Sequence, residues 1–110
     1  REQYAQFAGR AREKMNEYGY KVTVAVAPKI SNSQRGILVE GVDYALLGQN
    51  ADAVFLMTYE WGYTYGPPMA VAPLDKVREV VEYAVTQIQP AQLILGIHNY
   101  GYDWKDLAEM

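Results

Sequence analysis

Apolar residues follow two different rhythms along this chain. Over residues 2–18 and 72–90 they recur every three or four positions, which predicts amphipathic helices. Three short stretches between and after these helices are almost continuously apolar: KVTVAVAPK at 21–29, ADAVFLMTY at 51–59 and AQLILGIHNYG at 91–101. Such runs, rich in β-branched residues, are typical of strands that are covered on both faces. A further short helix is predicted at 41–51, closed by Gly48.

The order of these elements predicts the fold class. Helices and buried strands alternate three times, and the last residues, 105–110, resemble the first turn of another helix. This alternation is typical of parallel βα units, so we expect an α/β fold. Three parallel strands alone would leave two open sheet edges and little core. We therefore expect residues 1–110 to form part of one larger, incomplete domain, whose open edges leave self-association open.

Composition and charge exclude several classes of function. The chain has 110 residues, a net charge of −3 and a pI near 5, without any basic run, so we expect no nucleic-acid partner. No apolar stretch approaches the roughly 18 residues that a membrane-spanning helix needs, so we expect no membrane partner. There is no cysteine and only one histidine, His98. We therefore expect neither a metal site nor a cofactor.

The carboxyl ends of the predicted strands carry the candidate chemistry. Working groups of parallel α/β proteins lie at these ends, and here two of the three are crowded with aromatic rings beside hydrogen-bonding groups. This combination suits a pyranose, which has an apolar C–H face and a rim of hydroxyls. The candidates are Met57, Tyr59, Glu60 and Trp61 after the second strand, and His98, Tyr100 and Trp104 after the third.

The alternation of side chains along a strand predicts which of these candidates face the same side. It places Phe55, Met57 and Tyr59 on one face, whereas Glu60 has the opposite parity and joins the site only if the strand has already broken. Gly96 would leave room for a bulky neighbour or a ligand. Simpler interpretations stay open: Met57 as a core filler and Glu60 as a solvated loop acid. His98 could likewise be a structural histidine whose hydrogen bonds are satisfied within the fold, and Tyr63, Tyr65 and Tyr102 could simply cover loops.

Three segments together resemble glycoside hydrolase family 18. These are MTYEWG at 57–62, GPPMAVAPL at 66–74 and LGIHNYGYDW at 95–104; in that family the sixth barrel strand typically ends M-x-Y-D and the seventh is similar to L-G-x-P-x-Y-G-x-x-W. The amino-acid sequence of these segments is most similar to a branch of bacterial cell-wall and spore-cortex N-acetylglucosaminidases. The resemblance implies a parallel (β/α)8 TIM-barrel fragment, covering roughly the fourth helix (1–18) through the seventh strand (92–99), with strands five and six at 21–28 and 53–59.

The resemblance also implies a function and roles for the candidates. It implies a glycosidase that cleaves β-1,4-linked N-acetylglucosamine glycans of peptidoglycan, spore cortex or chitin by substrate-assisted retaining hydrolysis. Tyr59 and Glu60 would be catalytic, and the substrate-binding residues would be Met57, Trp61, His98, Tyr100 and Trp104. The implied location is the cell wall, the spore coat or the exterior.

Two departures from the family pattern qualify these implications. The acid of the family lies in D-x-x-D-x-D-x-E on the fourth strand, a motif that this sequence does not contain. In addition, Glu60 stands in place of the usual Asp, and His98 in place of the usual Pro. We therefore expect these 110 residues alone to be inactive. A non-catalytic, lectin-like carbohydrate-binding barrel is the alternative.

Overall fold

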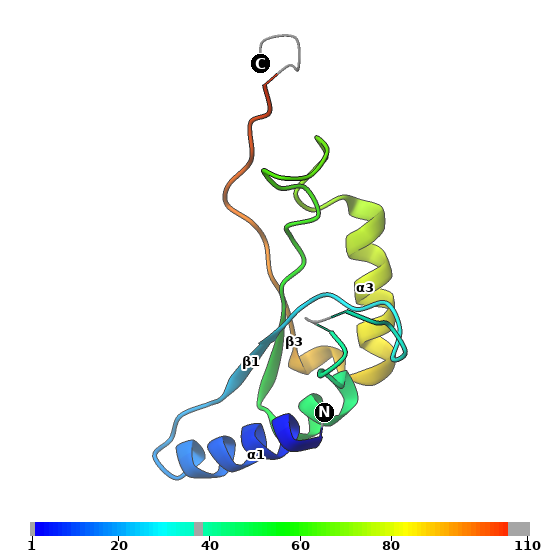
Figure 1. Ribbon diagram of the computed structural model, residues 1–110. Coiled ribbons are helices and arrows are strands. Elements are labelled where there is room, and N and C mark those ends of the chain that lie inside the picture. The colour runs from blue at the N-terminus through cyan, green and yellow to red at the C-terminus, as the bar shows by residue number, and fades with distance from the viewer. Residues whose placement is uncertain (1, 37–38, 106–110) are drawn as a thin grey trace.

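The predicted order of helices and strands is confirmed in a computed structural model, which describes residues 2–36 and 39–105 (Figure 1). The predicted helical turn at 105–110 lies, apart from Lys105, outside the described residues. The elements, in chain order, are α1 (Glu2–Asn16), β1 (Thr23–Val26), α2 (Tyr44–Asn50), β2 (Ala53–Leu56), α3 (Leu74–Gln87), the short 3-10 helix η1 (Pro90–Gln92) and β3 (Leu93–Leu95).

The three strands form one parallel sheet in the order β1-β2-β3. Val54 of β2 pairs with Val24 of β1 and with Leu93 of β3. Among the described residues, β1 and β3 each have one edge without a strand partner. Because all three strands run in the same direction, their carboxyl ends meet at one rim, as the candidate site requires.

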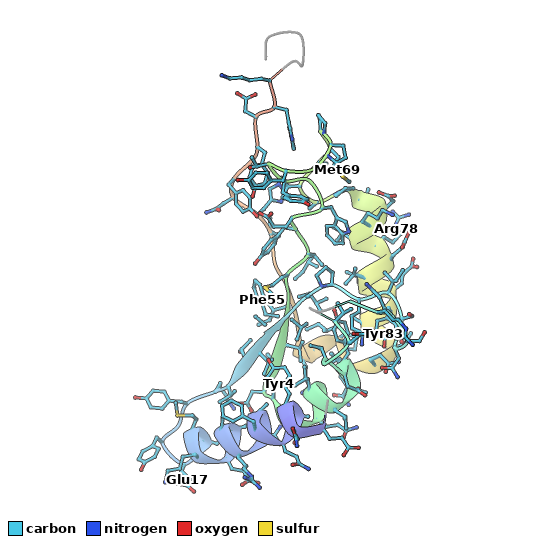
Figure 2. The ribbon with its side chains drawn as sticks, in the orientation of Figure 1. Tyr4, Glu17, Phe55, Met69, Arg78 and Tyr83 are labelled. Carbon is cyan, nitrogen blue, oxygen red and sulfur yellow. The ribbon has the colours of Figure 1, made fainter. Side chains whose placement is uncertain are left out.

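One face of the sheet carries the core. Val54, Leu56 and Thr58 are almost completely buried, whereas the alternate residues Phe55 and Met57 are only partly covered. Figure 2 shows Phe55 on the side of the strand away from α3. The prediction of strands covered on both faces is therefore wrong for the described residues, because all three helices share one core with the same face. That core contains Ala5, Ala8, Val24, Val26, Tyr44, Leu47, Ala51, Val54, Leu56, Val80, Ala84 and Ile88.

Small residues, rather than aromatic ones, bury the face of α1. Ala5 and Ala8 are buried, whereas Phe7, which belongs to the larger apolar stripe of this helix, is 69% exposed. A Cβ atom at Gly9 would lie 2.5 Å from Oδ1 of Asn50, so a larger residue here would require the Asn50 side chain to move. The periodicity therefore predicted the helix, but the close approach of two helices selected its buried side.

The boundaries of α2 differ from the sequence prediction at Gly48. Asp43 caps the helix by accepting a hydrogen bond from the backbone N–H of Leu46 at 3.1 Å. Gly48 lies inside the helix, which continues to Asn50. A Cβ atom at this position would lie 3.1 Å from Cγ1 of Ile88, so the glycine serves the packing of α2 against the end of α3. The prediction that Gly48 closes the helix is wrong for this reason.

The described chain is elongated. Its radius of gyration is 16.4 Å, and its principal extents are 58 × 30 × 24 Å. A compact domain of this length would have a radius of gyration of about 13 Å. In Figure 1 the segment after β3 and the loop after β2 extend beyond the sheet at its carboxyl end. Within residues 2–36 and 39–105, no helix is long and apolar enough to cross a membrane.

A buried tyrosine ties the end of β1 to α2. The Tyr44 side chain is fully buried; its hydroxyl donates to the carbonyl of Ala27 at 2.6 Å and accepts from the backbone N–H of Lys29 at 3.0 Å. The buried Lys29 ammonium donates to the carbonyl of Val42 at 2.6 Å. Burial raises the pKa of Tyr44 well above its usual value, so its phenol stays protonated. These contacts fix the first of the three strand ends at the rim.

We expect Tyr44→Phe to destabilise the whole protein by about 1–3 kcal/mol, because it leaves a buried backbone donor and a partly buried acceptor without their shared partner. Urea-induced unfolding would measure this loss. Tyr65→Phe is the matched control, since Tyr65 is 91% exposed. Equal free energies of unfolding for the two variants would contradict the anchoring role of Tyr44.

Candidate functional site

The site begins where β2 loses its regular strand geometry. The backbone N–H of Met57 still donates to the carbonyl of Val26 at 3.0 Å, but the N–H of Tyr59 folds back to the carbonyl of Met57 at 2.9 Å. Among the described residues, Glu60 is the only non-glycine residue with a positive φ, at 72°. The strand has therefore broken before Glu60, which is the condition under which this carboxylate could join the site.

A pocket of about 320 Å³ opens at this rim. Four of the seven candidate residues line it, Met57, Tyr59, Glu60 and Trp61, and Ala27 and Pro28 close it from the end of β1. The aromatic and aliphatic groups give it a mostly apolar wall with few polar groups, which is the usual character of a small-ligand site. The structure therefore brings the second-strand candidates together in one cavity.

The carboxylate of Glu60 joins this pocket to the segment after β3. Its Oε1 accepts hydrogen bonds from the hydroxyl of Tyr100 and, at 2.6 Å, from the hydroxyl of Tyr102. The hydrogen bond from Tyr100, followed by that from Tyr102, lowers the pKa of Glu60 below its usual range. In return, the hydrogen bond to Glu60, with a smaller contribution from desolvation, raises the pKa of Tyr100 to about 12. The segments that follow β2 and β3 therefore converge at one rim.

The segment after β3 carries a row of aromatic rings at every second residue. The ring centroids of His98 and Tyr100 lie 6.0 Å apart, those of Tyr100 and Tyr102 5.7 Å, and those of Tyr102 and Trp104 6.1 Å. Neighbouring rings are tilted or edge-on to one another, the arrangements that aromatic pairs prefer. We call His98, Tyr100, Tyr102 and Trp104 the aromatic row.

Tyr102 is the site residue that sequence reasoning missed. Its hydroxyl donates to Glu60 directly, whereas its position in the sequence is equally compatible with a residue that covers a loop. The signal that could have identified it is the two-residue period from His98 to Trp104, because side chains two apart on an extended chain share one face. Tyr100 and Tyr102 therefore had to point the same way.

Three candidates do not line the pocket. Tyr100 reaches it through its hydrogen bond to Glu60, whereas His98 and Trp104 lie further away from it. His98 lines a separate hollow of about 200 Å³, together with Leu74 and Val77 of α3. Its Nδ1 atom and Nε1 of Trp104 are buried without a hydrogen-bond partner among the described residues. Trp104 contacts the ring of Tyr102 at the far end of the aromatic row. The structure thus connects these two residues to the site only through the row itself.

The start of the loop after Trp61 is held close to the segment that leads into α3. The backbone N–H of Trp61 donates to the carbonyl of Val71 at 3.0 Å, and Figure 2 shows side chains crowded at this end of the sheet, near Met69. A Cβ atom at Gly62 would lie 2.2 Å from the carbonyl oxygen of Met69, so the loop closes in this way only with glycine. The glycine therefore allows Trp61 to remain on the pocket wall.

Gly96 has the spatial role that its position suggested. A Cβ atom there would lie 2.8 Å from the ring of Phe55, so the absent side chain makes room for a bulky neighbour. Beside it, the buried hydroxyl of Thr58 donates to the carbonyl of Gly96 at 2.8 Å. This bond extends the contact between the second and third segments beyond the regular sheet.

The polar groups at the rim include the hydroxyls of Tyr100 and Tyr102, which donate hydrogen bonds, and the carboxylate of Glu60, which accepts them. Across the two described ranges, no group of three or more His, Asp or Glu side chains could hold a metal ion. The groups that are present at the rim offer hydrogen bonding, ring stacking and the negative charge of Glu60.

A sequence model of the family described as "Glycosyl hydrolases family 18" matches residues 1–109. The chain belongs to glycosyl hydrolases family 18. Family 18 membership confirms the resemblance on which the barrel interpretation depends. The structure itself supports the coarser statement, an α/β unit with three parallel strands in an open sheet.

Individual relatives of this family 18 chain are spore enzymes and chitinases. It is 46% identical to a cortical fragment-lytic enzyme of Bacillus subtilis (strain 168), over 94% of the chain and 24% of that protein. It superposes on the spore cortex-lytic enzyme SleL of Bacillus cereus with a TM-score of 0.88 at 39% identity, covering 94% of the chain and 24% of that structure. A chitinase of Chromobacterium violaceum gives a TM-score of 0.75 at 27% identity, over 87% and 29%. The chain thus spans about a quarter of the length of its curated relatives.

Proposed function

We propose that the whole protein containing this chain is a glycosidase that cleaves β-1,4-linked N-acetylglucosamine glycans. The observation that carries the proposal is the pocket lined by Met57, Tyr59, Glu60 and Trp61, in a chain that belongs to family 18. Its relatives named as cortex-lytic enzymes favour peptidoglycan of the spore cortex as the substrate, and its chitinase relative favours the same sugar. The corresponding location is the spore or the cell wall.

The proposed reaction is substrate-assisted hydrolysis with retention. An acid elsewhere in the whole protein protonates the glycosidic oxygen, and the carbonyl oxygen of the substrate's own acetamido group attacks the anomeric carbon as that bond breaks. Water then opens the resulting oxazolinium ion. In this scheme the described residues hold the sugar and stabilise developing charge, which is where most of the rate enhancement of such a site would arise.

Each pocket residue has a proposed role that fits its position. The hydroxyl of Tyr59 would donate to the acetamido oxygen, and Met57 would form the floor beneath the sugar. Trp61 would stack against the apolar face of the ring, and the ionised Glu60 would lie near the developing positive charge. Tyr100 and Trp104 would border the cleft, and His98 would support its far end. The barrel span from the fourth helix to the seventh strand remains part of this proposal.

The test is an assay of the whole protein on two substrates, chitin oligomers and purified spore-cortex peptidoglycan. We expect reducing ends to be released, with the β configuration retained in the first product seen by NMR. An inverted product would contradict the mechanism. Binding to both glycans without any release of reducing ends would favour the lectin-like alternative, and neither binding nor release would exclude both functions.

A further inference from the structure

The two oxygens of the Glu60 carboxylate have unequal surroundings. Both phenol hydroxyls, from Tyr100 and Tyr102, donate to Oε1. No hydrogen bond from the described residues reaches Oε2, although Glu60 lines the pocket. A carboxylate oxygen accepts about two hydrogen bonds, so Oε1 is saturated and Oε2 retains its capacity.

The backbone at Glu60 adds a second sign that surrounding contacts hold the carboxylate in place. A positive φ of 72° is uncommon for a residue with a β-carbon, and such conformations persist where surrounding contacts maintain them. At this position the contacts are the turn from Tyr59 N–H to Met57 carbonyl and the two phenol hydrogen bonds. The side chain is thus turned out of the strand and fixed by residues of the neighbouring segment.

Tyr102 is itself held in place from both sides. Its ring lies edge-on to Tyr100, at an interplanar angle of 83°, and is tilted by 56° against Trp104. A phenol supported by two neighbouring rings loses little additional rotamer freedom when it donates to a carboxylate. The aromatic row therefore provides a preorganised donor for Glu60.

We propose that Tyr102 is a positioning residue that, together with Tyr100, occupies Oε1 of Glu60 and leaves Oε2 as the acceptor for a hydroxyl or amide N–H of the bound N-acetylated sugar. This inference rests on the proposed function, since it assigns Glu60 a sugar as ligand. It also gives Glu60 a defined chemical state: a carboxylate that receives two phenol hydrogen bonds is an acceptor and not the proton donor of the reaction.

Tyr102→Phe in the whole protein tests this proposal, because it removes one hydroxyl and retains the ring that packs in the aromatic row. We expect kcat/KM on chitin oligomers to fall about tenfold, as expected when a contacting group is slightly misplaced. We also expect the acid limb of the pH profile of kcat/KM to move to higher pH, because loss of one donor lets the pKa of Glu60 rise towards its usual value.

The matched control is Tyr20→Phe. Tyr20 is 63% exposed and precedes β1, at the opposite end of the sheet from the rim, so we expect no change in rate or pH profile. A tenfold loss of activity with an unmoved acid limb would overturn the positioning role, because Tyr102 would then act on the substrate directly. An unchanged rate and an unchanged profile would overturn it as well.

A titration of the Glu60 carboxyl, followed by carbon-13 NMR in the whole protein without substrate, separates this proposal from the proposed function. We expect Tyr102→Phe to raise the pKa of Glu60 and Tyr20→Phe to leave it unchanged. This result would hold even if the protein hydrolysed neither glycan, in which case only the proposed function would fail. An identical titration in wild type and Tyr102→Phe would contradict the two-phenol arrangement itself.

Discussion

Replacing Tyr59 with phenylalanine in the whole protein is expected to lower kcat about a hundredfold, because a single preorganised donor to a reacting group contributes on the order of 2–4 kcal/mol to lowering the barrier. Tyr59 lines the pocket, and its proposed partner is the acetamido oxygen that becomes the nucleophile. Steady-state kinetics on chitin oligomers would measure the loss, which should fall on kcat more than on KM.

The fold of the Tyr59→Phe variant should be unaffected, since only one oxygen atom is removed from a half-buried side chain. Circular dichroism and urea unfolding would verify this point, and Tyr20→Phe serves again as the rate control. Turnover equal to that of the wild type would remove Tyr59 from the mechanism while leaving the rest of the pocket in place.

Replacing Glu60 with glutamine is expected to lower kcat by a factor of about ten to one hundred, because a neutral amide no longer stabilises positive charge that develops on the sugar. The amide also has only one oxygen, which cannot both accept from the two phenols and remain free for a ligand. Glu60→Asp separates the two causes, because it keeps the charge but shortens the side chain by one methylene. A loss of kcat similar to that of Glu60→Gln would indicate that the position of the carboxylate matters more than its charge.

The pH dependence of the wild type follows from the direction of the Glu60 shift. Because its pKa is lowered in the folded protein, Glu60 is fully ionised above the usual glutamate range and gains a proton only as the pH falls through the lowered value. Activity that depends on the carboxylate should therefore persist below the usual glutamate pKa. If the acid limb of kcat/KM lies at or above the usual glutamate pKa and does not change in Glu60→Gln, the limb reports the titration of another group.

Local periodicity was sufficient to predict much of this fold. The three apolar runs and the helical stripes gave the element order and the parallel sheet, and parallel strands fixed a common rim. The strands are shorter than predicted, with β1 limited to Thr23–Val26 and β3 to Leu93–Leu95, because hydrogen-bond pairing and not apolar character defines their ends. The sequence indicated that Glu60 could join the site only if the strand broke before it, and this break is present.

Features that depend on the packing of distant segments could not be predicted in the same way. The buried side of α1 depends on its packing against α2, where Gly9 faces Asn50, 41 positions further along the chain. His98 shares a face with Tyr100 by parity, yet it lines a different hollow, formed partly by α3. Tyr102 escaped recognition because its partner, Glu60, comes from another segment, and no local pattern specifies which carboxylate a phenol will contact.

The aromatic row has a consequence for how this stretch of chain can vary in length. Its rings share one side because they occupy alternate positions of an extended segment, and the phenols of Tyr100 and Tyr102 depend on that phase. Removing or adding a single amino acid between Gly96 and Tyr100 would turn both phenols to the opposite face of the extended segment. A change of two amino acids would restore the face but shift the phenols along the direction of the chain. Length changes in this stretch should therefore be tolerated only in even steps.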